Sequence, residues 1–247
     1  MISVKTPEEI AIMAQAGQML AKIIRELKAE VKPGLTTQEL NKLSEELILK
    51  SGAKPAFKGY GGFPASLCTS INEQIVHGVP SKRELKEGDI LSLDLGLIYN
   101  NFYSDMAVTL AIGSVSSRVR QLIQVTKIAL KRAIACAKPG KTIGDISFTI
   151  QKYVQAQGFQ VVRELCGHGV GRQLHEKPDI PNFGYSHKGP ELKSGMVLAF
   201  EPMVVLGQPG IKKGPDGFCY QTADNSLSAH FEHTIAIINQ GAQILTK

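Results

Sequence analysis

Four acidic residues are the side chains of this chain that could do chemistry together. They lie in or beside apolar, strand-like segments, and they are Asp94, Asp105, Glu201 and Glu232. An ionised carboxylate in such surroundings is costly unless it is paired, and no run of basic residues stands near any of the four. A divalent cation would compensate their charge, and four carboxylates suit two dications better than one.

The first two acids belong to a predicted β-hairpin. Leucines at positions 91, 93, 95 and 97 alternate with period 2, which predicts a strand with Asp94 on the face opposite the leucines. Residues 99–101 predict a turn into a second strand that carries Asp105. A two-residue loop would put both carboxylates on one face, where they repel unless a proton or a cation lies between them. The alternative is a solvated face with two unrelated aspartates.

An imidazole to complete such a site is expected in residues 166–178, CGHGVGRQLHEKP. His168 stands between two glycines in a predicted loop and is interpreted as a fifth ligand; the alternative is a structural or solvated histidine. The glycine spacing is not that of a nucleotide-binding loop, and Pro178 disfavours a following helix. Spacing alone assigns only structural or solvated roles to His77, His187, His230 and His233, and His233 should point away from the face of Glu232.

A pair of divalent metals held by such donors predicts hydrolytic chemistry. Two ions about 3.5–4 Å apart activate a water at neutral pH and polarise a carbonyl, as in aminopeptidases. Oxygen ligands with one or two imidazoles favour manganese, iron, cobalt or zinc. A two-metal phosphatase is disfavoured because the sequence has no basic phosphate-binding cluster.

Composition excludes several other classes. The 247 residues carry a net charge of +6 with scattered Lys and Arg, so specific nucleic-acid binding is not expected. The four cysteines form no C-x-x-C pair, which argues against a zinc knuckle or a disulfide scaffold. The N-terminal segment has no apolar signal region and no apolar run approaches about 18 residues. These features predict a cytoplasmic protein without a membrane segment.

The elements that must position the site repeat along the chain. Helices are expected from Thr6 to about 32, 36–51, 117–137 and 142–157; strands are expected at 66–71, 159–165, 196–205 and 231–238. Segment 32–40 resembles segment 138–146, and in both one helix ends and the next begins. Segment 86–94 resembles segment 193–201, and in both a strand begins that carries an acidic residue. We interpret 1–247 as one domain with an internal repeat, 1–112 and 113–247, although Pro-Gly stops and Thr starts also recur by chance.

These residues stand in motifs that identify a family. The chain resembles the bacterial type I methionine aminopeptidases, of metallopeptidase family M24, in KTPEEI, SINEQIVHGVP, GDILSLDLG, CGHGVGRQLHE, FEPM and SLSAHFEHT. The resemblance covers nearly the whole chain. It implies the α+β pita-bread (creatinase/aminopeptidase) fold, in which two pseudo-symmetric halves pack helices outside a curved antiparallel sheet.

The resemblance also implies a complete site. Its metal ligands would be Asp94, Asp105, His168, Glu201 and Glu232, with Asp105 and Glu232 bridging two divalent ions of cobalt, manganese, iron(II), zinc or nickel. Glu201 would shuttle the proton of the attacking water. His175 would stabilise the tetrahedral intermediate and His77 would contact the substrate backbone, so both are expected to be catalytic and substrate-binding.

A methionine pocket is implied at Tyr60, Phe63, Cys68 and Phe218, whose apolar bodies and one sulfur suit a thioether. Phe218 stands where relatives often carry Trp, and Phe63 where many carry Tyr; ordinary packing is the alternative for all four. The implied activity removes the N-terminal methionine of nascent proteins when the second residue is small. The enzyme would be a monomer, and contact with the ribosome is implied although no motif here encodes it.

Two other readings share the fold. X-Pro aminopeptidases and prolidases have the same ligand set, but they usually carry an additional N-terminal domain that this chain lacks. Non-catalytic binding proteins on this fold typically lose ligands, whereas all five are present here. Release of methionine from peptides, tested against X-Pro substrates, would separate these classes.

Overall fold

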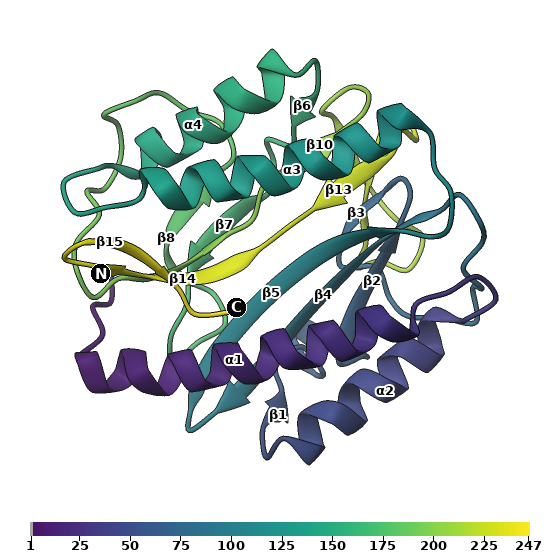
Figure 1. The fold of residues 1–247 in the computed structure, drawn as a ribbon, viewed down its shortest axis with the longest axis horizontal. Coiled ribbons are helices and arrows are strands. Elements are labelled where there is room, and N and C mark those ends of the chain that lie inside the picture. Colours follow the sequence, from purple (N-terminus) through teal and green to yellow (C-terminus); the bar gives the residue numbers. More distant parts are fainter. Residues whose placement is uncertain (1) are drawn as a thin grey trace.

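The computed structural model describes residues 2–247 as an antiparallel sheet structure covered by helices (Figure 1). Within these residues the four α-helices are α1 (Pro7–Glu30), α2 (Thr37–Lys50), α3 (Ser117–Cys136) and α4 (Ile143–Ala156). The strands of the first half are β1 (Lys54–Pro55), β2 (Leu67–Ile71), β3 (Gln74–Val76), β4 (Ile90–Tyr99) and β5 (Phe102–Ala111). Those of the second half are β6 (Gln160–Val161), β7 (Cys166–Gly169), β8 (Glu176–Pro181), β9 (Val197–Phe200), β10 (Met203–Val205), β11 (Ile211–Lys213), β12 (Tyr220–Thr222), β13 (Ser228–His230), β14 (His233–Ile238) and β15 (Gly241–Ile244).

Three of the helices begin at a threonine that forms a capping box. Thr6, Thr36 and Thr142 each accept a hydrogen bond from the backbone N–H three residues on, and the acid at that position accepts from the threonine N–H. Each box satisfies two of the donors that a helix N-terminus leaves free. The predicted helix starts and ends are confirmed to within two or three residues. None of the helices in residues 2–247 combines the length and apolar character needed to cross a membrane.

The first half is built on the hairpin of β4 and β5. Asn100 and Asn101 form its two-residue loop, both with positive φ, which is the geometry of a type I′ turn. The other edge of β4 pairs with β2 and then β1. Helices α1 and α2 cover the outer face of this sheet, and the four leucines of β4 are fully buried beneath them (Figure 1).

The second half supplies a five-stranded sheet in the order β15-β14-β9-β7-β8 and a smaller sheet in the order β13-β10-β6, under α3 and α4 (Figure 1). The halves meet where β5 lies beside the β13–β14 segment. The Glu232 N–H donates to the Ala107 carbonyl (2.9 Å), and the Thr234 hydroxyl donates to the Asp105 carbonyl (2.8 Å). These bonds join the acid-bearing segment of one half directly to that of the other.

Equivalent positions of the two halves have equivalent geometry. Gly34 and Gly140 have φ of 86° and 85°, and Gly88 and Gly195 both have φ of 90°. The helix caps Thr36 and Thr142 each form an isolated antiparallel bridge to a glutamate of the same half. This correspondence supports a duplication. The division into 1–112 and 113–247 within one domain stays a prediction.

Three strand predictions need correction. The segment 159–165 forms only the two-residue strand β6 before the chain turns toward β7. The segment 196–205 divides into β9 and β10 at Glu201, because Pro202 has no N–H to continue a ladder. The last segment becomes a strand only at His233, so Glu232 lies just before β14. His168 was expected in a loop but lies on strand β7.

Candidate metal centre

Five donor side chains from both halves of the molecule converge on one cavity. Asp94 lies on β4, Asp105 on β5 and His168 on β7; Glu201 directly follows β9, and Glu232 directly precedes β14. All five line a cavity of about 900 Å³, together with the six other residues predicted for substrate or catalysis, which are Tyr60, Phe63, Cys68, His77, His175 and Phe218. The sequence-predicted residues are therefore brought together, while their individual roles stay predictions.

The hairpin register sets the relative positions of the first two carboxylates. Asp94 pairs with Ala107 and Asp105 pairs with Gly96, so the two aspartates lie diagonally on the same face, as predicted. Gly96 leaves no room for a side chain, because a Cβ there would lie 2.6 Å from the Phe57 ring. On this face of the hairpin the position next to both aspartates therefore carries no side chain.

His168 reaches the cavity from a strand that its glycine neighbours allow to pack closely. A Cβ at Gly167 would lie 2.4 Å from the Ala199 carbonyl oxygen, and one at Gly169 would lie 2.4 Å from that of Lys177. Glycine therefore serves close strand packing here, where the sequence pattern predicted a loop. The ring Nδ1–H donates to the Gly169 carbonyl (2.9 Å), which leaves the Nε2 lone pair facing the acids.

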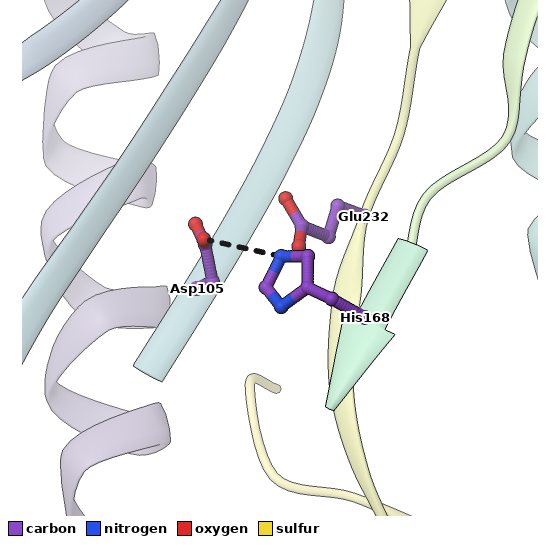
Figure 2. Close-up of side chains that lie close together, drawn as sticks. All are labelled: Asp105, His168 and Glu232. Carbon is purple, nitrogen blue, oxygen red and sulfur yellow. Dashed lines mark ion pairs between the residues drawn. The ribbon is translucent and has the colours of Figure 1, made fainter. Parts of the chain in front are cut away.

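The distances around Nε2 of His168 are short. It lies 4.0 Å from Asp105 Oδ2 and 3.5 Å from Glu201 Oε1. Figure 2 shows Asp105, His168 and Glu232 pointing toward one another, and one donor atom from each lies within 4.8 Å of the other two. This spacing would let three different strand segments share one cation.

Burial gives the carboxyl groups unusual proton affinity. It raises the pKa of Asp94 to about 7 and that of Glu201 to about 8. Burial, followed by repulsion from the neighbouring acids, raises the pKa of Asp105 and of Glu232 well above the ordinary range. Burial also lowers the pKa of His168 to about 3, which keeps this imidazole neutral at neutral pH.

The donor set fits divalent cations. Among residues 2–247, the buried oxygens Asp94 Oδ1, Asp105 Oδ1 and Glu232 Oε1 have no hydrogen-bond partner. No lysine or arginine in this part of the chain forms an ion pair with any of the four acids. Buried, unpaired carboxylates beside a neutral imidazole are the ligands that Mn, Fe, Co and Zn accept.

The two histidines predicted for substrate contact flank this cluster. The His175 ring lies 4.3 Å from the His168 ring, centroid to centroid, and its Nδ1 lies 2.8 Å from the Tyr60 hydroxyl. His77 has a φ of +59°, a conformation that L-residues rarely adopt and that concentrates at functional sites. Gly78 next to it packs so closely that a Cβ would lie 2.2 Å from the Thr69 carbonyl oxygen.

An apolar part of the cavity adjoins the acids. Phe63 and Phe218 meet edge to face at 5.5 Å between ring centroids, and Cys68 belongs to the same apolar cluster. Cys68 pairs with Asp94 across β2 and β4, so the apolar wall and the acidic cluster are neighbours in one sheet. A side chain held in this apolar space would present its adjoining backbone to the donors.

Sequence reasoning missed one residue that faces the site. His230 is 1% exposed, and its Nε2 lies 3.4 Å from Glu201 Oε2. Neither ring nitrogen of His230 has a hydrogen-bond partner within the described residues. The available signal was its position two residues before Glu232, since residues two apart on an extended chain point to the same side.

This fold, with acids and imidazoles gathered in one cavity, defines a metal-dependent hydrolase. The model of metallopeptidase family M24 matches residues 11–239. The methionine aminopeptidase of Clostridium perfringens is 48% identical over 246 residues, spanning 100% of this chain and 99% of that protein. The chain belongs to metallopeptidase family M24, as the sequence motifs predicted.

Solved structures confirm the predicted pita-bread fold. The crystal structure of methionine aminopeptidase from Thermotoga maritima has a TM-score of 0.99, with 47% identity and full coverage of both chains. Prolidase from Pyrococcus furiosus has a TM-score of 0.79 and 29% identity, and the match spans 99% of this chain but 65% of the prolidase. The similarity to the methionine aminopeptidase is therefore higher in both sequence and structure.

Proposed function

We propose that this chain is a methionine aminopeptidase, which removes the N-terminal methionine of proteins and peptides when the second residue is small. The observation that carries the proposal is the apolar space of Phe63, Cys68 and Phe218 beside the five-donor cluster in one cavity. A flexible, polarizable thioether suits such a wall. The relatives named above support the same activity.

Two divalent ions are the proposed cofactors, and their identity is left open among cobalt, manganese, iron(II), zinc and nickel. Asp105 and Glu232 would hold both ions, His168 and Glu201 one, and Asp94 the other. When bound, such ions lower the pKa of water and polarise the scissile carbonyl. The unpartnered oxygens of Asp94, Asp105 and Glu232 support this assignment.

The chain's own groups would handle the protons. Glu201, whose side chain lines the cavity with the other four donors, is suited to take a proton from the attacking water and return it to the leaving amine. When the Tyr60 hydroxyl donates to Nδ1 of His175, the ring carries its hydrogen on Nε2, where it can donate to the carbonyl oxygen as negative charge develops. His77 would bind the substrate backbone at the scissile peptide.

Peptide selectivity tests the proposed activity. We expect the metal-loaded protein to release methionine from Met-Ala-Ser, and to leave Met-Lys-Ser essentially uncleaved, because a long second side chain would not fit beside the buried cluster. Free methionine is measured by chromatography, with the metal-free protein as the control. Release of the first residue from X-Pro dipeptides instead would favour a prolidase, and no cleavage of any peptide would favour a binding protein.

A cationic surface supports the proposed contact with the ribosome. Residues 106–163 contain nine basic residues and one acidic residue, a net charge of +8, whereas the whole chain carries +6 and the remainder therefore −2. Within residues 2–247 none of these nine forms an ion pair, and most are exposed on α3 and α4. Such a face suits the phosphate backbone of RNA without sequence readout. A cytoplasmic, monomeric enzyme acting on newly made chains is part of the same proposal.

Charge reversal on α3 tests this contact. The Lys127→Glu/Lys131→Glu variant is expected to lower the salt dependence of ribosome binding, the slope of log K against log salt, by roughly two, since two phosphate contacts are lost. Binding is measured by co-sedimentation at several salt concentrations. The matched variant Lys22→Glu/Lys28→Glu on α1 should bind like wild type. Equal effects of the two double variants would refute a specific cationic face.

A further inference from the structure

Glu201 is flanked by two imidazoles, one at each carboxylate oxygen. Oε1 lies 3.5 Å from Nε2 of His168, the candidate metal ligand, and Oε2 lies 3.4 Å from Nε2 of His230. His230 is outside the predicted ligand set and lies deeper than Glu201, with 1% of its surface exposed. It faces the carboxylate from the side away from His168.

The backbone of His230 is fixed on both sides. Its N–H donates to the Thr109 hydroxyl oxygen (2.8 Å), and that hydroxyl donates back to the His230 carbonyl (2.7 Å). Ser92 of β4 hydrogen-bonds the same Thr109 hydroxyl at 2.8 Å. On the other side His230 pairs with Met203 of β10, two residues beyond Glu201. Strands of both halves therefore fix the backbone from which the His230 ring extends.

A fixed and buried imidazole needs a partner. Buried polar atoms in folded proteins are nearly always hydrogen-bonded, and an unmade bond costs free energy. Both ring nitrogens of His230 lack a protein partner within the described residues, and the nearest carboxylate to Nε2 is that of Glu201. A small movement of either side chain would shorten the 3.4 Å between His230 Nε2 and Glu201 Oε2 to a charge-assisted hydrogen bond.

We propose that His230 is a positioning residue for Glu201: its Nε2–H donates to Oε2 and holds the carboxylate with Oε1 turned toward His168 and the cavity. The proposal rests on the proposed function, in which Glu201 both binds a cation and moves a proton. A carboxylate free to rotate would lose its alignment for both tasks. Groups that orient ligands in this way are worth about 10- to 100-fold in metal affinity or activity.

Substitutions of His230 distinguish the effect of its N–H donor from the effect of the ring itself. In His230→Leu we expect kcat for Met-Ala-Ser to fall about 10- to 100-fold and KM to stay within about twofold. The affinity of the metal-free protein for Mn²⁺, measured by calorimetry, should weaken in the same variant. His230→Gln places an amide N–H near the position of Nε2 and should restore both quantities to within about threefold of wild type, whereas His230→Asn reaches only the position of Nδ1 and should not.

His233→Gln provides the matched control, because His233 points away from the site and hydrogen-bonds Thr246 (2.8 Å). Its kcat and Mn²⁺ affinity should equal those of wild type. Unchanged kcat and Mn²⁺ affinity in His230→Leu would overturn the proposal, and so would a Gln variant as impaired as the Asn variant. If the Leu variant does not fold, the Gln and Asn comparison decides. Failure of the proposed function is distinguishable, because wild-type protein would then release no methionine.

Discussion

Asp105→Asn is expected to leave a folded protein that has lost nearly all peptidase activity and much of its affinity for divalent cations. Asp105 is 3% exposed, and its Oδ1 has no hydrogen-bond partner among residues 2–247. Asparagine has the same shape, so packing on β5 is preserved. It carries no charge, however, and one of its two terminal atoms can only donate, which removes an anionic ligand from the position predicted to bridge both ions.

The size of the loss follows from what the ions contribute. Polarisation and water activation by bound metal are worth several kcal/mol, and each 1.36 kcal/mol is a factor of ten in rate. We therefore expect kcat/KM for Met-Ala-Ser to fall by on the order of 10³ or more. Metal affinity is measured by calorimetry on the metal-free variant, and folding by circular dichroism and thermal unfolding.

Asp224→Asn serves as the control for this substitution. Asp224 caps a loop through bonds to the Gln208 and Ser226 N–H groups and does not line the cavity. Its loss should affect stability but neither kcat nor metal affinity. Turnover of Asp105→Asn within about tenfold of wild type would contradict the bridging role and with it the two-metal mechanism.

Local sequence patterns predicted most of the helices and the central hairpin. The helix starts near Thr6, Thr36 and Thr142 and the turn within residues 99–101 depend on neighbouring residues alone, and the structure confirms them. The hairpin register follows from that turn and puts Asp94 and Asp105 on one face. These features could be predicted because each is decided within a few residues.

Contacts between distant segments could not be predicted in this way. His168 lies on a strand because its glycines face the carbonyls of Ala199 and Lys177, which the periodicity of β7 alone does not reveal. His230 faces Glu201 because β13 pairs with β10, a contact between two short strands with little pattern of their own. The expected roles of His77 and His175 likewise came from the resemblance to a family, because spacing alone assigned these histidines no role.

The metal-free protein is expected to become less stable as pH rises from about 6.5 to about 8. Burial raises the pKa of Asp94 to about 7 and of Glu201 to about 8, and raises those of Asp105 and Glu232 still more clearly. In the unfolded chain these groups are ionised above about pH 5. The folded state therefore binds more protons than the unfolded state in this window, and stability falls with rising pH.

Histidines set the lower limit of the window. Burial lowers the pKa of His77 and His233 to about 4 and of His168 to about 3, so below about pH 6.5 the unfolded chain binds the extra protons and the slope opposes that of the acids. Above 6.5 the opposing contribution fades as the unfolded chain loses its histidine protons, and above about 7.5 only the carboxyl groups contribute. One excess proton gives about 1.4 kcal/mol per pH unit, so about 2 kcal/mol or more is lost across the window. The melting temperature should drop by roughly 4–8 °C.

Bound cations should remove this pH dependence, because they replace the protons that the four carboxyl groups hold. Calorimetric melting of metal-free protein at pH 6.5, 7.0, 7.5 and 8.0, with and without saturating Mn²⁺, measures both slopes. With metal the melting temperature should be higher and level or rising across the series. Metal-free Asp105→Asn, which has one fewer raised carboxyl group, should show a shallower fall than wild type. A metal-free melting temperature that rises with pH would mean that the acids are ionised and paired in the folded state, and that the buried cluster does not need cations to balance it.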